Sequence, residues 1–343
     1  MAHFARFGGP IRPIAVAAPF APSSGSRSSS GSVGTLRLMS WNLLAPPYNR
    51  REQGPPDAAA EEWRPRALAQ LSLVAEALPD IVGLQEFWSA NESFVLLWRD
   101  FADRFGYVMH VVPRVDSKSD GCCLLVRLPP SKCSFSGFTY DDWGSRILQM
   151  AELRVNDATP PLVLMQTHLS FPHRSEHDPP MRYQQARKIS DLISELWKSR
   201  GAIPTCIFGD LNGNQDDPAV TLLTESGGLR PMPPPTRAQD SVRDEPEPWA
   251  HPHTKSGWIT HVAHTGAHMA CDLVLTRGDC CVREWTLGGS ESALVAGCFV
   301  SDHLPVIATL VLDRTVIAEM AGTHRPLPDE GPESAAAAVA AAL

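Results

Sequence analysis

The chain has 343 residues, of which 43% are hydrophobic and 20% charged, a composition typical of folded globular proteins. Its formal net charge of -8 at pH 7 argues against a broad basic surface for non-specific nucleic-acid binding, but it leaves room for a local basic pocket. The eight cysteines include no C-x-x-C pair, which argues against a structural zinc site, and no apolar run approaches the ~20 residues of a transmembrane helix.

Residues 1–34 are predicted to form a disordered leader. Six arginines precede the first acidic residue, Glu52, and the stretch 23–32 is rich in serine. An arginine-rich, serine-rich and acid-poor composition is that of an organellar transit peptide. Two interpretations stay open. One is a transit peptide, for which the early prolines favour the chloroplast over the mitochondrion. The other is a leader without an address on a cytoplasmic protein.

The following segments alternate apolar strands with single helices. Strands are predicted at 35–44, 80–87, 122–128, 146–155, 161–169, 204–210, 269–276 and 303–312, and helices at 64–79, 91–106 and 182–200. Residues 213–256 are rich in proline and charge and are predicted to be poor in periodic structure, and within them 231–253 is predicted to form a long surface loop that is partly ordered over the site. Because strands outnumber helices and no regular βαβ order is visible, the pattern predicts an α+β sandwich.

The end of the chain loses this pattern. After about residue 317 the sequence becomes alanine-rich, and no amphipathic period requires it to pack. We therefore expect a single catalytic domain at 35–316 and a disordered tail at 317–343.

Acids, amides and imidazoles gather at six ends of the predicted strands. They are Asn42, Glu86, His168, Asp210 with Asn212, Asp272, and Asp302 with His303. A carboxylate at the end of a buried strand is costly unless it is paired or bound to a metal. Any one of these residues alone is better explained as a satisfied structural polar group. Six strand ends with the same chemistry predict a site instead.

Three of these residues are candidate metal ligands. Asn42, Glu86 and Asp302 offer oxygen atoms and no sulfur. Hard oxygen donors suit Mg²⁺ or Mn²⁺ rather than Zn²⁺, and Mg²⁺ needs few protein ligands because it keeps waters and bridges to phosphate.

The other five residues are candidates for proton transfer and phosphate binding. His168 and His303 can donate to phosphoryl oxygens or act as bases, and Asp272 can orient one of them. Asp210 can orient or deprotonate an attacking water, and Asn212 can donate to the phosphoryl group as negative charge develops. The whole set predicts metal-assisted phosphoester hydrolysis.

Five histidines also crowd residues 251–268. A second metal site is one interpretation of this segment. A loop rim beside the substrate is the preferred one, because no acids or cysteines accompany the histidines as further ligands.

Five motifs occur along the chain in the order "SWNLLA", "LQEFW", "THLSFPH", "GDLNG" and "SDHLPV". In this order and spacing, over roughly residues 35–315, the sequence resembles the endonuclease/exonuclease/phosphatase superfamily. The resemblance implies the DNase I-like fold, a four-layer α/β/β/α sandwich of two mostly antiparallel sheets. The nearest branches are the deadenylase-like one and a plant calcium-binding one. The interval between Asp272 and Asp302 contains no EF-hand loop, so we do not expect calcium regulation through that module.

The resemblance also implies a role for each of the eight residues. The implied metal ligands are Asn42 and Glu86, with Asp302 close to the metal. The implied phosphate binders are His168 and Asn212, the implied water-activating residue is Asp210, and the implied catalytic pair is His303 with Asp272. Whether the aspartate or the histidine is the base stays open.

The expected activity is that of a Mg²⁺-dependent phosphodiesterase or nuclease that acts on nucleic acid or nucleotides as a monomer. The acidic net charge favours single-stranded substrates or RNA over long duplex DNA. Two alternatives stay open. One is a lipid or inositol phosphoester hydrolase, which the same fold can support. The other is a non-catalytic scaffold, against which the intact polar set argues.

Overall fold

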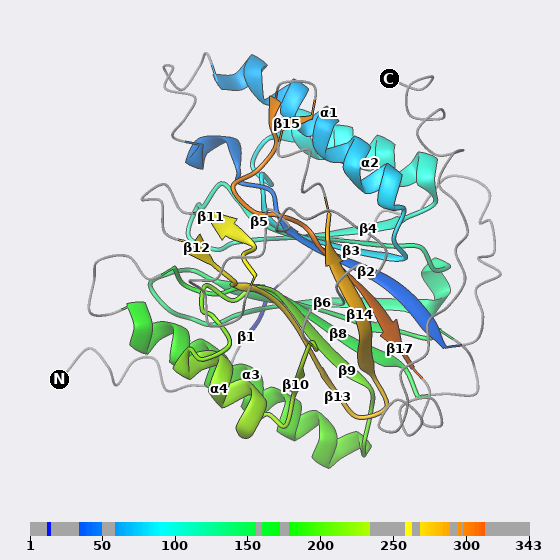
Figure 1. Ribbon diagram of the computed structural model, residues 1–343, viewed down its shortest axis with the longest axis vertical. Coiled ribbons are helices and arrows are strands. Elements are labelled where there is room, and N and C mark those ends of the chain that lie inside the picture. Colours follow the sequence, from blue (N-terminus) through cyan, green and yellow to red (C-terminus); the bar gives the residue numbers. More distant parts are fainter. Residues whose placement is uncertain are drawn as a thin grey trace, which may run out of the picture.

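Two β-sheets lie face to face, with helices on both outer faces (Figure 1). The computed structural model describes residues 12–14, 34–49, 59–155, 160–171, 178–233, 258–262, 268–288, 294–295 and 298–312. The architecture confirms the predicted α+β, four-layer sandwich of mostly antiparallel sheets.

The first sheet has seven strands in the order β1-β6-β7-β8-β9-β13-β10. They are β1 (Arg12–Ile14), β6 (Cys133–Thr139), β7 (Ile147–Leu153), β8 (Leu162–His168), β9 (Thr205–Asp210), β13 (Asp272–Arg277) and β10 (Arg230–Pro231). Strands β8 and β9 run parallel, and every other neighbouring pair runs antiparallel. Helices α3 (Asp178–Arg200) and α4 (Pro218–Glu225) cover the outer face of this sheet (Figure 1).

The second sheet has six strands in the order β14-β17-β2-β3-β5-β4, and β2 and β3 are its parallel pair. They are β14 (Cys281–Leu287), β17 (Val306–Val311), β2 (Thr35–Asn42), β3 (Ile81–Phe87), β5 (Gly121–Val126) and β4 (Val108–Pro113). Helices α1 (Ala59–Ala77) and α2 (Glu92–Phe105) cover its outer face (Figure 1). Two short ribbons pair β11 (His261–Val262) with β12 (His268–Met269) and β15 (Leu294–Val295) with β16 (Cys298–Phe299).

Strand β2 shows why the central strands appear in the sequence as continuous apolar runs. Leu36 and Leu38 belong to the core between the sheets, whereas Met39 and Trp41 pack in the core with α1 and α2. Successive side chains of a strand point to opposite faces, so a strand covered on both faces needs apolar residues at nearly every position.

Three of the strands with more than three residues were not identified from the sequence, and neither were the two- and three-residue strands β1, β10, β11, β15 and β16. Strands β6 and β14 alternate buried with more exposed residues, and β4 is short and contains His110 and Pro113. A search for continuous apolar runs finds strands that are buried on both faces and passes over half-exposed ones.

The prediction that residues 213–256 are poor in periodic structure is wrong near their start, where α4 (Pro218–Glu225) forms. There the carboxylate of Asp217 accepts a hydrogen bond from Ala219 N and caps α4, and Pro218 occupies the first helical position. The part of this segment at 234–256 lies outside the described residues.

The predicted terminal segments are described only in small part. Within 1–34, residues 12–14 form β1, and the remainder apart from residue 34 lies outside the described residues, as does the predicted tail at 317–343. Across the described ranges, no helix is both long and apolar enough to cross a membrane.

His110 is a buried titratable residue of β4. Its ring stacks on Phe135 with 4.7 Å between centroids, and its Nδ1 lies 2.8 Å from Gln149 Nε2. Burial lowers the pKa of His110 to about 4, so the folded protein holds a neutral ring at pH 7. Histidine in an unfolded chain titrates near 6.5, so between pH ~6.5 and the folded pKa the unfolded state binds more protons. The stability contributed by neutral His110 is therefore lost as the pH falls through this window.

We expect His110→Phe to flatten the pH dependence of stability in this window. His110 should account for a loss of at most about 3 kcal/mol of unfolding free energy as the pH falls from 7 to 4, and phenylalanine keeps the stack without titrating. Urea unfolding at pH 7, 5.5 and 4.5 measures the difference between wild type and variant. Equal pH slopes in the two proteins would refute the assignment.

Candidate active site

One row of three polar side chains crosses the first sheet. His168 is the register partner of Asp210 across the parallel pair β8–β9, and Asp272 is its register partner across the antiparallel pair β9–β13. Directly paired positions point to the same face of a sheet. The strand register therefore brings together three residues that are far apart in the sequence.

The second sheet brings its residues to the same place. Asn42 ends β2, and Glu86 lies near the end of β3 at an irregularity in the register between Leu84 and Phe87. Glu86 has φ 51°, which is uncommon for a residue with a Cβ and is typical of a strand bulge that redirects a side chain. Ser301 Oγ donates to the Asn42 carbonyl over 2.7 Å and ties the segment before β17 to the same point.

Gly209 allows Asp210 to take its position. It has φ 134°, and a Cβ at this position would lie 2.0 Å from the Thr167 carbonyl oxygen. Only glycine fits this close approach of β9 to β8. The first residue of the "GDLNG" motif, Gly209, is therefore explained by packing, and the second, Asp210, by the site.

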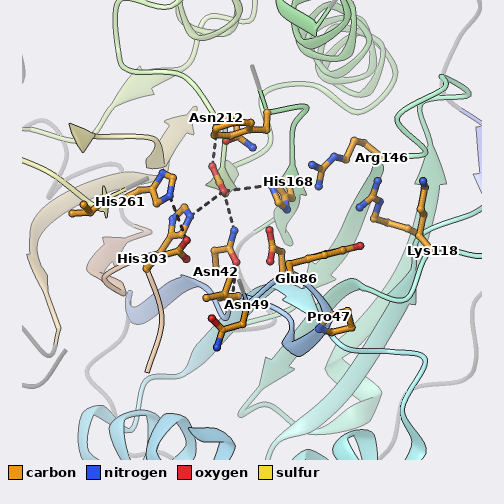
Figure 2. Close-up of a pocket in the computed structure, with 17 residues that line it drawn as sticks. Asn42, Pro47, Asn49, Glu86, Lys118, Arg146, His168, Asn212, His261 and His303 are labelled. Carbon is orange, nitrogen blue, oxygen red and sulfur yellow. Dashed lines mark hydrogen bonds and ion pairs between the residues drawn. The ribbon is translucent and has the colours of Figure 1, made fainter. Parts of the chain in front are cut away.

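Asp210 is the centre of the hydrogen-bond network (Figure 2). Asn42 Nδ2 donates to its Oδ2 over 3.0 Å, and the Nε2 atoms of His168 and His303 lie 3.4 and 3.7 Å from the same oxygen. The backbone N–H of Asn212 donates to Oδ1 over 2.9 Å. Burial alone would raise the pKa of Asp210, but the facing imidazoles and the Asn42 amide hold it below its usual range.

The two histidines beside Asp210 carry different charges. Burial lowers the pKa of His168 far below its usual value, the positive charge of Arg146 lowers it further, and His168 is therefore neutral. Burial also acts to lower the pKa of His303, but the carboxylates of Asp272 and Asp210 outweigh it and raise that pKa to about 10. With this pKa, buried His303 is an imidazolium at pH 7, and its Nδ1 donates to Asp272 Oδ2 over 2.8 Å.

The carboxylates next to this network fit a divalent cation. Burial raises the pKa of Glu86 to about 7, and the negative charges of Asp120 and Asp302 add to the effect. Asp302 Oδ1 is buried and has no hydrogen-bond partner within the described part of the chain. Neighbouring carboxylates of this kind repel one another unless a cation neutralises them, and their oxygens match a hard ion.

Two further groups have ligand atoms close enough to hold an ion. The ligand atoms of Asp210, Asp272 and His303 lie within 4.8 Å of one another, as do those of His261, Cys271 and His303. The His261 and His303 rings stack in parallel, so their nitrogen lone pairs do not converge, which argues against the second group. The fold thus contains a buried site with donors suited to a metal.

A pocket of about 430 Å³ opens above these residues (Figure 2). Seven of the eight predicted residues line it, and these are Asn42, Glu86, His168, Asp210, Asn212, Asp302 and His303. Asp272 does not line the pocket, but it is hydrogen-bonded to His303, which does.

Three basic residues of the pocket were not identified from the sequence, and these are Arg114, Lys118 and Arg146. The Arg114 guanidinium already donates to Asp120 and to two backbone carbonyls, so it holds loops together. Within the described ranges, the Arg146 guanidinium has no hydrogen-bond or ion-pair partner, and its Nη1 is buried. In Figure 2 it points toward His168. The feature of the sequence that could have identified Arg146 is a charged residue directly before a strand that is otherwise mostly buried.

The histidine-rich segment contributes one residue to the pocket. His261 lines it, whereas His268 is exposed on β12, and the other three histidines of the segment lie outside the described residues. His261 is a buried residue of strand β11, and the sequence did not distinguish it from the other four histidines.

The sequence model of the Endonuclease/Exonuclease/phosphatase family matches residues 39–303. Among curated proteins, the "Uncharacterized calcium-binding protein At1g02270" of Arabidopsis thaliana is 24% identical over 258 residues, which cover 70% of this chain and 50% of that protein. The chain therefore spans about half the length of the curated relative that it matches.

Solved structures share the fold at low identity. Truncated Caenorhabditis elegans TDP2 has a TM-score of 0.57 at 18% identity and covers 81% of this chain and 98% of its own. The human Nocturnin catalytic domain with bound sulfate has the same TM-score and identity, with 81% and 95% covered. ANGEL2, a 2′,3′-cyclic phosphatase in complex with adenosine-2′,3′-vanadate, has a TM-score of 0.55 at 16% identity, with 81% and 96% covered. These similarities concern the fold alone.

Proposed function

The chain belongs to the endonuclease/exonuclease/phosphatase family, as its motifs predicted, and on this premise we propose that it is a Mg²⁺-dependent phosphodiesterase that acts on nucleic acids or nucleotides. One observation carries the proposal. The buried carboxylate of Asp210 lies between a neutral and a charged histidine at the base of a pocket, next to carboxylates that fit a cation. Such pairs of groups with opposed pKa shifts are typical of acid–base sites.

The charges suggest a role for each group. Ionised Asp210 is the proposed base that orients and deprotonates water, because the His303 imidazolium has no free lone pair with which to accept a proton. His303 would donate to a phosphoryl or leaving-group oxygen, and Asn212 would donate to the phosphoryl group. A divalent cation held by Asn42, Glu86 and Asp302 would polarise the phosphoryl oxygen as a Lewis acid.

The basic end of the pocket favours a substrate with more than one negative charge. Arg146 and Lys118 line the pocket on the side away from His261 (Figure 2). A nucleotide chain brings a second phosphate there, whereas a choline lipid headgroup would bring a positive charge against the two basic residues. Inositol polyphosphates are the second candidate, because they also carry several anionic groups.

Hydrolysis assays with the purified chain test the proposal. We expect turnover of oligo(A), single-stranded DNA or a 5′-phosphorylated dinucleotide in Mg²⁺ or Mn²⁺, and none of sphingomyelin. Turnover of inositol phosphates alone would replace nucleotides by the second candidate. No turnover of any substrate in either metal would contradict catalysis and favour a non-catalytic scaffold.

Arg146→Met should lower kcat/KM for the preferred substrate by about 10- to 100-fold, because a preorganised positive charge that meets the phosphoryl group is lost. Steady-state kinetics measure the effect. Arg154→Met is the matched control, since Arg154 is exposed just past the far end of β7. If both variants keep wild-type kinetics, Arg146 does not bind substrate.

A further inference from the structure

The segment that carries the proposed catalytic histidine has a short strand beside it. Val262 N donates to the Asp302 carbonyl over 3.1 Å, and Leu304 N donates to the Thr260 carbonyl over 2.7 Å. His261 and His303 are antiparallel bridge partners between these two bonds. The β11–β12 ribbon is therefore joined by backbone hydrogen bonds to the turn that presents Asp302 and His303.

The side chains of this bridge also meet. The His261 ring lies flat on the His303 ring, with 4.0 Å between centroids and 7° between planes. His261 Nε2 lies 3.6 Å from Asp302 Oδ2 (Figure 2). Both histidines are buried, so water does not separate the two rings.

Thr260, directly before β11, holds in place the carboxylate that is hydrogen-bonded to His303. Thr260 Oγ1 accepts hydrogen bonds from the backbone N–H groups of Cys271 and Asp272, each over 3.1 Å. Asp272 then holds the Nδ1 edge of His303, and His261 covers the face of its ring. A hydrogen bond at one edge leaves the ring free to rock about that bond, and a flat partner on its face removes this freedom.

We propose that His261 is a positioning residue of the active site, whose ring fixes the plane of His303 and whose Nε2 fixes the carboxylate of Asp302. The expected effect on activity rests on the proposed function, whereas the expected effect on the position of the His303 ring does not. Supporting groups that orient a catalytic side chain or a metal ligand typically change activity or metal affinity by about 10- to 100-fold when removed.

Two substitutions separate the two contacts. His261→Leu fills the space without a flat ring or a nitrogen, so kcat should fall about 10- to 100-fold with KM nearly unchanged, and half-saturation with Mg²⁺ should need several-fold more ion. His261→Phe restores only the flat ring, so kcat should return to within about 3-fold of wild type while the Mg²⁺ requirement stays raised. Exposed His268 on the same ribbon supplies the control, His268→Leu, for which neither value should change.

A spectroscopic measurement reports the position of His303 without turnover. The Nδ1 proton shared with Asp272 should give a downfield proton NMR signal that is present in wild type, His261→Phe and His268→Leu, and absent from His303→Asn. In His261→Leu we expect this signal to broaden or vanish. Circular dichroism confirms folding, and His261→Asn replaces the leucine variant if the latter does not fold.

The outcomes distinguish the two proposals. If wild type is active and His261→Leu matches His268→Leu in kcat, Mg²⁺ requirement and NMR signal, the positioning role is refuted and the function stands. A loss of thermal stability alone, with these values unchanged, would likewise reduce His261 to a packing residue. If wild type hydrolyses no substrate, the proposed function falls. The NMR signal of His261→Leu then decides the inference, since an unchanged signal overturns it and a lost one supports it.

Discussion

Asp210→Asn should lower kcat by about 10³-fold or more and leave the fold and Mg²⁺ binding largely intact. An amide keeps the size of the carboxylate, and its oxygen can still accept from Asn42 or Asn212. It cannot take a proton from water or hold the imidazolium charge of His303 at 3.7 Å. Loss of a general base alone typically costs about 10²–10⁴-fold, and here an ion pair is lost as well.

Single-turnover kinetics with saturating Mg²⁺ measure this effect, and circular dichroism checks the fold. Asp216→Asn is the matched control, because Asp216 is an exposed acid six residues further along the same loop. If the kcat of Asp210→Asn is within 10-fold of that of the control, the assignment of Asp210 as the base is refuted.

Glu86→Gln should raise the Mg²⁺ concentration for half-maximal activity by more than about 100-fold. The amide oxygen can still accept from Ala45 N, as Glu86 Oε2 does over 3.0 Å, so the local backbone has no reason to change. What is lost is a negative charge that would offset the charge of the ion. The effect should exceed the ~10- to 100-fold typical of groups that only orient a ligand.

The same substitution has a second, opposite effect on the metal-free protein. The pKa of Glu86 is raised to about 7 by burial and by the neighbouring charges of Asp120 and Asp302. Removing its charge relieves this repulsion, so the melting temperature without metal should stay equal or rise, while the increase produced by Mg²⁺ should shrink. Glu76→Gln, at an exposed position of α1, controls for a change in net charge. A Mg²⁺-induced shift equal to that of the control would refute Glu86 as a ligand.

The substitutions of Asp210 and Glu86 test two different parts of the proposed active site. Asp210 belongs to a row of residues on the first sheet, and Glu86 comes from a bulge in the second. A catalytic centre that spans two packed sheets depends on the packing between them. Gly83 of β3 is one point at which this dependence is visible, because a Cβ there would lie 2.2 Å from the Phe208 ring of β9 in the other sheet.

The local sequence was sufficient to predict those helices and strands whose hydrophobic pattern or end residues lie within a few positions of one another. Strand β2 is buried on both faces and therefore appears as an apolar run, and α2 is delimited by the Asn91 cap and by Gly106 in the left-handed conformation. The half-exposed strands β6 and β14 carry a weaker alternating signal and were not identified. Helix α4 was also missed, because its short apolar face lies in a proline-rich segment.

The sequence by itself determined the family, the sandwich of two sheets and the eight polar residues, of which seven line the pocket and Asp272 is hydrogen-bonded to one of them. Each of these could be predicted because its signal lies in short motifs and at the ends of strands. Only the tertiary structure decided that His168 is neutral and His303 charged, that Arg146 faces the pocket without a partner among the described residues, and that His261 lies on His303. These properties depend on burial and on charges contributed by distant segments, such as Asp272 beside His303 and Arg146 beside His168. The electrostatic field at a buried group is set by whichever neighbours the fold brings near it, and sequence spacing does not encode those distances.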